Sequence, residues 1–123
     1  MFYPPMIGYL VVSAVCVVLV ICQRRKPIVR NSVVGIRTRY TLMSEAAWQA
    51  GQRAGSPYLI AMAVIGLSHA VALFGVELAS VTRIGHVASV LGWVLIIICA
   101  VLAVRAANAA ARAAGPRNSP CRQ

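Results

Sequence analysis

The chain has 123 residues, of which 60% are hydrophobic and only 11% are charged, and its formal net charge is +10 at pH 7. This composition lies far from that of an average soluble domain, and the length leaves room for one small helical unit without a second domain. In a soluble protein such a charge would suggest a nucleic-acid partner. Here the positive charges flank apolar runs, and this placement accounts for the net charge without a nucleic-acid partner, so we expect none.

Three uncharged apolar runs dominate the sequence, at residues 6–22, 58–78 and 84–104. About 20 apolar residues in a helix cross the hydrocarbon core of a bilayer, where unpaired backbone groups are not tolerated. The sequence therefore predicts an all-α membrane protein in which residues 1–115 form a single domain. Its three transmembrane helices are expected at about residues 6–22, 57–79 and 83–105.

Lys and Arg residues are distributed unevenly around these runs. Eleven of the twelve lie in the loop 23–56 or after the third run, whereas Arg83 lies in the short linker between the second and third runs. Because basic residues accumulate in short cytoplasmic loops, this distribution predicts an N-terminus outside the cell and a cytoplasmic C-terminus. The positive cluster 23–26 follows the first run, so we expect a retained anchor and not a cleaved signal peptide.

Residues that start or stop helices mark the ends of the second and third runs. Ser56 and Pro57 combine a capping side chain with a residue suited to the first helical turn, so we expect the second span to begin there. Thr82 is a comparable N-cap candidate for the third span. Gly115 is expected to stop an Ala-rich extension of that span, and residues 116–123 should be disordered.

The loop 23–56 contains a helical pattern of its own. Ser44 is a good N-cap, Glu45 favours the positive start of a helix, and residues 46–54 are mostly helix formers. We therefore expect a short interfacial cytoplasmic helix between the first and second spans.

One face of this short helix collects small and aromatic side chains and is expected to lie on the bilayer or on the bundle. These residues are Ala47, Trp48, Gly51 and Ala54 or Gly55. The side chains expected to point elsewhere are those of Glu45, Gln49, Gln52 and Arg53. Trp48 and Tyr40 belong to the residue types that settle at headgroup level, so we expect them to anchor the segment there.

Small residues at four-residue spacing occur in the second and third spans, where they let helix backbones approach closely in lipid. The pairs are Gly66 with Ala70, Gly75 with Ala79, Gly85 with Ser89, and Ala88 with Gly92. The short linker between the two spans makes them antiparallel neighbours.

Three ionisable residues form a candidate polar site within or beside the spans: His69, Glu77 and His86. His69 lies near the middle of the second span, where the alternative to a functional role is a neutral ring bonded to a neighbouring hydroxyl. The candidate hydroxyls are those of Ser13, Ser68 and Ser89. Glu77 lies near the outer end, where Arg83 or His86 could neutralise it across the tight turn.

Few other residues could carry chemistry. The chain has two acidic residues and two histidines, with no nucleophile placed beside a base, so we expect neither an enzyme nor a cofactor. Cys16, Cys22 and Cys99 lie in the apolar runs without metal-ligand spacing, and we expect small hydrophobes there and no metal site.

Eight positions in the loop carry a family resemblance: Asn31, Gly35, Ile36, Arg37, Thr38, Thr41, Ser44 and Trp48. Their succession, which continues to Gly55 just before a membrane span, resembles the signature of the SdpI family of bacterial membrane proteins. The resemblance covers about 25 residues, and the flanking spans agree with it in placement.

The resemblance implies a multi-pass protein of the bacterial cell membrane that protects its producer from a secreted toxic peptide. The namesake is also thought to signal by holding a transcriptional repressor at the membrane. The present chain has about half of the namesake's membrane content. The partners implied are membrane lipids, a toxic peptide and a cytoplasmic regulator.

The motif has two physical interpretations. Gly35 permits a turn or close approach, and Asn31, Thr38, Thr41 and Ser44 can satisfy loop backbone groups, so the motif could be structural. Alternatively it binds a ligand, since Arg37 could hold helix-end carbonyls or bind a lipid phosphate or an acid on a partner.

A second function remains open at this point. A small transporter or accessory membrane subunit would use His69 and Glu77 to line a polar path. Three helices enclose little space, so this function would require a homo-oligomer.

Overall fold

The computed structural model describes residues 3–26, 30 and 35–115. It consists of three helices: α1 (Tyr3–Arg25), α2 (Glu45–Leu78) and α3 (Thr82–Ala114). Each is long and apolar enough to cross a membrane, and no strand occurs among the described residues, so the predicted all-α membrane fold is confirmed. The expected disorder of residues 116–123 concerns residues outside this description.

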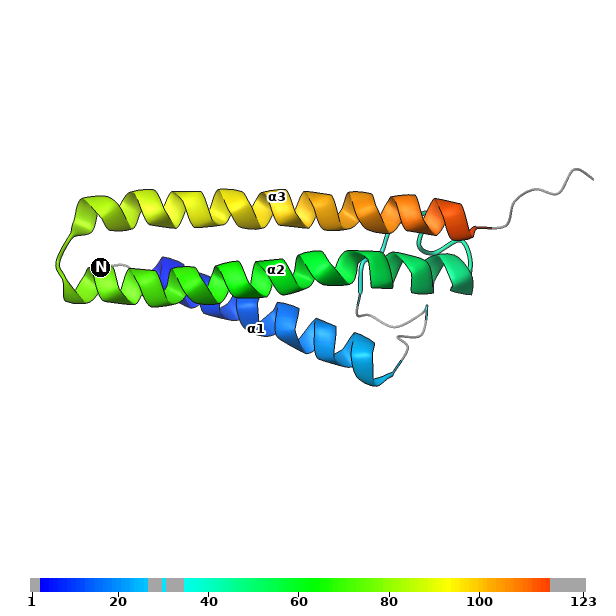
Figure 1. Cartoon of the computed structure of the whole chain (residues 1–123), viewed down its shortest axis with the longest axis horizontal. Helices are drawn as coiled ribbons and strands as arrows, with labels where there is room; N and C mark the ends of the chain where they lie inside the picture. The colour runs from blue at the N-terminus through cyan, green and yellow to red at the C-terminus, as the bar shows by residue number, and fades with distance from the viewer. Residues whose placement is uncertain (1–2, 27–29, 31–34, 116–123) are drawn as a thin grey trace, which may run out of the picture.

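The three helices form a narrow bundle around α2 (Figure 1). Helices α2 and α3 run antiparallel and side by side along their whole length, joined by the turn 79–81, as the short linker predicts. Helix α1 packs on α2, and its C-terminal end diverges from the other two (Figure 1). The described part of the connection between α1 and α2, residues 35–44, lies at the ends of α2 and α3 opposite the turn.

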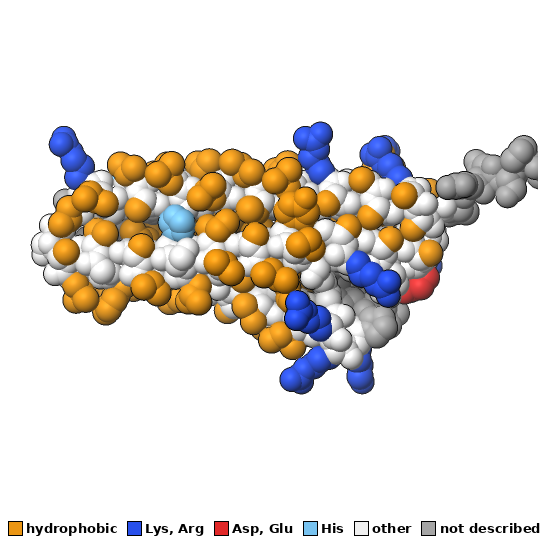
Figure 2. All heavy atoms as spheres, in the orientation of Figure 1, with side chains coloured by type: hydrophobic (Ala, Val, Ile, Leu, Met, Phe, Trp, Pro, Cys, Tyr) orange, Lys and Arg blue, Asp and Glu red, His pale blue; other side chains and the backbone are white. Residues whose placement is uncertain are grey.

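Exposed apolar side chains form a belt over the part of the bundle between the turn and the loop where α2 begins, on the face shown in Figure 2. On α3 this apolar belt covers residues 84–104, between Arg83 and Arg105. At 1.5 Å per residue those residues span roughly 32 Å, which matches the ~30 Å hydrocarbon core of a bilayer. The exposed Val, Leu and Ile side chains of the belt therefore have lipid as their natural surroundings.

Two of the helices are longer than the belt. Helix α2 has 34 residues and α3 has 33, lengths of about 50 Å each. The excess lies away from the turn, where α2 begins and α3 ends. We call this part of the molecule, residues 35–56 and 103–115, the loop end. Figure 2 shows Lys and Arg side chains gathered toward it.

The prediction of a separate interfacial helix is wrong. Residues 45–54 form the first turns of α2, which continues through Ser56 and Pro57 into the membrane span. Proline removes one backbone donor, the one that would bond the carbonyl of Arg53, but close packing compensates. An added Cβ at Gly51 would lie only 3.3 Å from the Ala107 carbonyl oxygen, so α2 and α3 approach closely across this segment.

Besides the start expected at Ser56 and Pro57, three helix ends are predicted from the sequence, and two of these predictions are confirmed. Ser44 is the N-cap of α2, because its side chain accepts a hydrogen bond of 3.0 Å from the Ala47 N–H. Gly115 is the C-cap of α3 and donates its N–H to the Ala111 carbonyl at 2.9 Å. The expected N-cap role of Thr82 is wrong, since the cap is Val81, which makes no side-chain capping bond.

Tyr9 of α1 joins all three helices inside the belt. Its ring is fully buried, stacks on Trp93 at 5.0 Å between centroids and lies 5.5 Å from the His69 ring. Its hydroxyl donates to the Ser89 carbonyl. Gly92 makes room for this arrangement, because a Cβ there would collide with both Tyr9 and His69.

We predict that Gly92→Ala destabilises the bundle by about 1–3 kcal/mol, since the added methyl group forces the Tyr9 and His69 rings to shift. Gly75→Ala is the matched control, because nothing lies within 4 Å of a Cβ at Gly75. It should be neutral or stabilising by up to about 1 kcal/mol, the gain in helix propensity. Unfolding of the purified protein in detergent measures both, and equal stability of the two variants would contradict the packing described.

Candidate functional site

The loop segment 35–44, which carries most of the family motif, is held against α2 and α3 by a series of contacts that begins at Gly35. This residue has φ +126°, a conformation that favours glycine. A Cβ there would lie 2.8 Å from the side-chain oxygen of Gln52. The turn expected at Gly35 is therefore confirmed, and its cause is the close approach of a buried side chain on α2.

Gln52 clamps the residue after the turn. Its Nε2 donates to the Ile36 carbonyl at 2.9 Å, and its Oε1 accepts from the Ile36 N–H at 3.0 Å. Gln23, near the end of α1, adds a longer bond of 3.4 Å to the same Oε1. One side-chain amide thus connects α1, the loop and α2.

The expectation that Gln52 points away from the packed face is wrong. Its side chain is 3% exposed, because its partners are backbone groups of the loop rather than water. The Ile36 side chain continues the contact by packing onto Gly55, where a Cβ would collide with it.

Two threonines extend the fastening to α3. Thr41 is fully buried, and its Oγ1 accepts from the Thr38 N–H at 2.9 Å and lies 3.1 Å from the Ile36 carbonyl oxygen. Thr38 in turn donates its hydroxyl to Oδ1 of Asn108 at 2.5 Å. Sequence reasoning missed Asn108, although it is the one uncharged polar residue in the Ala-rich stretch 106–114.

We call this set of contacts the loop lock: Gly35, Ile36, Thr38, Thr41, Gln52 and Asn108. It favours the structural interpretation of most motif residues, because their side chains are used within the protein. Ser44 adds the N-cap of α2.

One aromatic residue of the loop end, Trp48, differs from expectation. Trp48 is fully buried, so its predicted place among lipid headgroups is wrong. Trp48, Ala47 and Gly51 are all buried. This face of α2 therefore packs on the bundle and not on the bilayer, which was one of the two predicted surfaces. The close packing of α3 against α2 provides the burial that the sequence alone did not reveal.

Tyr40 is partly exposed and lies between two arginines. The guanidinium carbons of Arg39 and Arg112 lie 4.6 Å and 3.9 Å from its ring centroid. Arg39 also donates to the Tyr40 hydroxyl. This hydrogen bond lowers the pKa of the Tyr40 phenol below its usual value, and the positive charges of both arginines act in the same direction.

Two other motif residues are Arg37 and Asn31. The side chain of Arg37 is exposed on the loop surface, where its predicted interactions with helix ends, lipid phosphate or a partner acid remain predictions. Asn31 lies outside the described residues.

The candidate polar residues of the belt do not form one cluster. Nδ1 of His69 lies 2.9 Å from the Ile65 carbonyl oxygen, so its partner is its own helix backbone and not one of the expected serine hydroxyls. Glu77 is half-buried about 12 Å further along α2, and His86 is exposed on the first turns of α3. Neutralisation of Glu77 by Arg83 or His86 stays a prediction.

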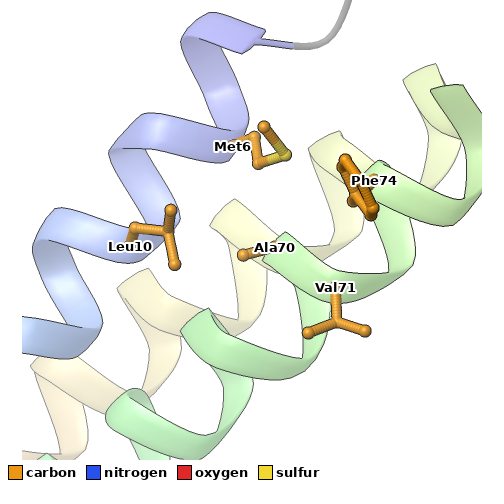
Figure 3. Close-up of a pocket in the computed structure, with 5 residues that line it drawn as sticks. All are labelled: Met6, Leu10, Ala70, Val71 and Phe74. Carbon is orange, nitrogen blue, oxygen red and sulfur yellow. The ribbon is translucent and has the colours of Figure 1, made fainter.

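The belt also carries an apolar groove between α1 and α2, of about 250 Å³. Figure 3 shows the side chains around it, Met6 and Leu10 from α1 and Ala70, Val71 and Phe74 from α2. Such a surface suits an acyl chain or an apolar helix and offers no polar chemistry. Among the described residues, Cys16, Cys22 and Cys99 are free thiols, and no three His, Cys, Asp or Glu side chains group as metal ligands.

We predict that Gln52→Ala lowers the free energy of unfolding by about 2 kcal/mol, because it leaves the Ile36 N–H without its partner and removes one of the two donors, Gln52 and Thr41, that bond the Ile36 carbonyl. Gln49→Ala is the control, since Gln49 bonds Glu45 on the surface, and it should cost less than about 0.5 kcal/mol. Denaturation in detergent compares them. Equal losses of unfolding free energy in the two variants would contradict a stabilising role of the Gln52 hydrogen bonds to Ile36.

Comparison with known proteins agrees with this geometry. The sequence model of the SdpI/YfhL protein family matches residues 28–107, a range that holds the loop motif, all of α2 and most of α3. No curated protein and no solved structure matches the chain. The family match covers well over half of the sequence and includes every residue of the loop lock except Asn108, so the chain belongs to the SdpI/YfhL family.

Proposed function

We propose that this protein protects a bacterial cell from a toxic peptide that acts on its membrane, and that its loop end engages a cytoplasmic partner. Membership of the SdpI/YfhL family supports a role of this kind. The apolar belt offers a surface for a membrane-bound peptide. The loop end offers a basic surface for a soluble protein.

The observation that carries the proposal is the loop lock. A plain connection between two spans needs no buried glutamine clamp and no bond to α3, yet this loop has both. Holding residues 35–44 in one conformation removes much of the entropy that a flexible loop would lose on binding. A fixed, exposed Arg37 is therefore well prepared to recognise a partner.

We also propose that the loop end lies in the cytoplasm and the turn 79–81 outside. Arg24, Arg25, Arg53, Arg105 and Arg112 lie toward the loop end, and Arg83 lies beside the turn. Basic residues are retained on the cytoplasmic side during insertion, so the imbalance favours this orientation in the bacterial plasma membrane.

The second candidate function, a small transporter or accessory subunit acting as a homo-oligomer, is supported by His69, which lies beside the Tyr9 ring in the belt. Its separation from Glu77 by about two helical turns gives no continuous polar path within one copy. The first function is therefore the better supported.

Expression in a host that is sensitive to the toxic peptide tests the proposal. We expect the wild type to protect growth, and Arg37→Ala to reduce protection at least tenfold in tolerated peptide concentration, because the exposed guanidinium is lost. Arg53→Ala, which removes an equally exposed arginine of α2, is the control and should protect like the wild type, as should His69→Ala and Glu77→Ala.

The opposite pattern would overturn the proposal. Protection that survives Arg37→Ala but fails with His69→Ala or Glu77→Ala, together with pH-dependent solute flux in vesicles, would favour the transporter. Membrane abundance and unfolding of every variant must match the wild type, so that loss of fold is not mistaken for loss of function.

A further inference from the structure

The arginines of the loop end lie at two depths. Arg105 closes the apolar belt on α3, and Arg53 on α2 lies at about the same level, since the neighbouring Gly55 and Gly51 face Ala103 and Ala107. Arg112 is seven residues further along α3, about 10 Å beyond the belt. The headgroup layer extends only about 5–8 Å on each side of the hydrocarbon core. Arg112 therefore reaches past the lipid headgroups into water.

At this outer depth, two guanidinium groups converge on one phenol. Arg39 and Arg112 both lie over the Tyr40 ring, within 4.6 Å and 3.9 Å of its centroid, and both side chains are exposed. The cation–π contacts hold two like charges close together at a fixed place. The loop lock supports the position, because Thr38 bonds Asn108, one turn before Arg112.

The chain offers little charge of its own to compensate this pair. It has only two acidic side chains. Glu77 lies near the opposite end of α2, so Glu45, which accepts a hydrogen bond from Gln49 at 2.9 Å, is the one acid of the two at the loop end, where the arginines outnumber it. A positive pair fixed in this way is a site for an anion, and guanidinium groups bind carboxylates with paired hydrogen bonds.

We propose that Arg39, Tyr40 and Arg112 form a docking site for an acidic segment of a soluble protein, which is recognised through its Asp and Glu carboxylates. This inference rests on the proposed partner-binding role of the loop end and names the chemistry of that partner. The depth of the site favours a protein over the membrane, since anionic headgroups lie closer to Arg53 and Arg105. The Tyr40 hydroxyl and ring fix the spacing of the two guanidinium groups.

Peptide binding to the full-length protein in phosphatidylcholine nanodiscs tests the proposal. The probe is a short fluorescent peptide of alternating Glu and Ser, with a Gln and Ser peptide as its neutral counterpart. We expect the acidic peptide to bind, and the double variant R39Q/R112Q to weaken it at least about tenfold. Tyr40→Ala should weaken it as well, whereas Tyr40→Phe keeps the ring and should stay within about threefold of the wild type.

The matched control is R24Q/R25Q, which removes the same charge at the end of α1. Equal weakening by the two double variants would mean attraction to overall charge, and the inference would fall. It would also fall if phosphatidylglycerol in the nanodiscs abolished binding as fully as R39Q/R112Q does, because headgroups would then occupy the site. Unfolding in detergent verifies that both double variants are folded.

The outcome is separable from that of the protection assay. Acidic-peptide binding that depends on Arg39 and Arg112 supports the docking site even if the protein protects no host, a result that would contradict only the proposed function. Protection by a protein that fails to bind the acidic peptide would overturn the docking site and leave the immunity role standing.

Discussion

The mismatch between helix length and bilayer thickness is the constraint on which the rest of this structure depends. A hydrocarbon core accommodates about 20 helical residues, but α2 and α3 have 34 and 33. About two fifths of each helix must therefore lie outside the core. There the two helices pack through small residues: Ala107 and Ala111 of α3 are buried, and a Cβ at Gly51 of α2 would lie 3.3 Å from the Ala107 carbonyl oxygen. Their close approach builds the platform on which the loop is locked.

Most of what the sequence predicted follows from composition and local pattern. The three spans, the N-cap at Ser44 and the turn at Gly35 need only hydropathy, capping chemistry and the conformational freedom of glycine. The family resemblance likewise rests on a local succession of residues. These features could be predicted because each is determined within a few residues of the chain or by the lipid.

The errors share a different cause, which is contact between distant segments. Pro57 signals a helix start locally, but packing on α3 carries α2 through it. Gln52 and Trp48 are residue types expected at a surface or a membrane interface, but in the folded chain both are buried. Asn108 gains its role only through Thr38, 70 residues away in sequence. No pattern along the chain contains these partners, and no single-sequence rule could have placed them.

The continuity of α2 also gives the proposed function a physical route. The same helix contacts Tyr9 of α1 in the belt and carries Gln52 at the loop end. A peptide that displaced α1 or α2 within the membrane could move the clamp, because α2 continues as one helix between the two regions. Coupling of this kind requires the lock to have a second arrangement, which is where a signal would differ from simple immunity.

Accessibility labelling tests the central claim most directly, namely that the loop end projects from the cytoplasmic face while the belt lies in lipid. In a cysteine-free background, Met43→Cys and Ala113→Cys should react with an impermeant maleimide only in inside-out vesicles. Ser80→Cys should react only in intact cells, and Val64→Cys in neither. Labelling of Met43→Cys in intact cells, or protection of Ala113→Cys like that of Val64→Cys, would contradict the account.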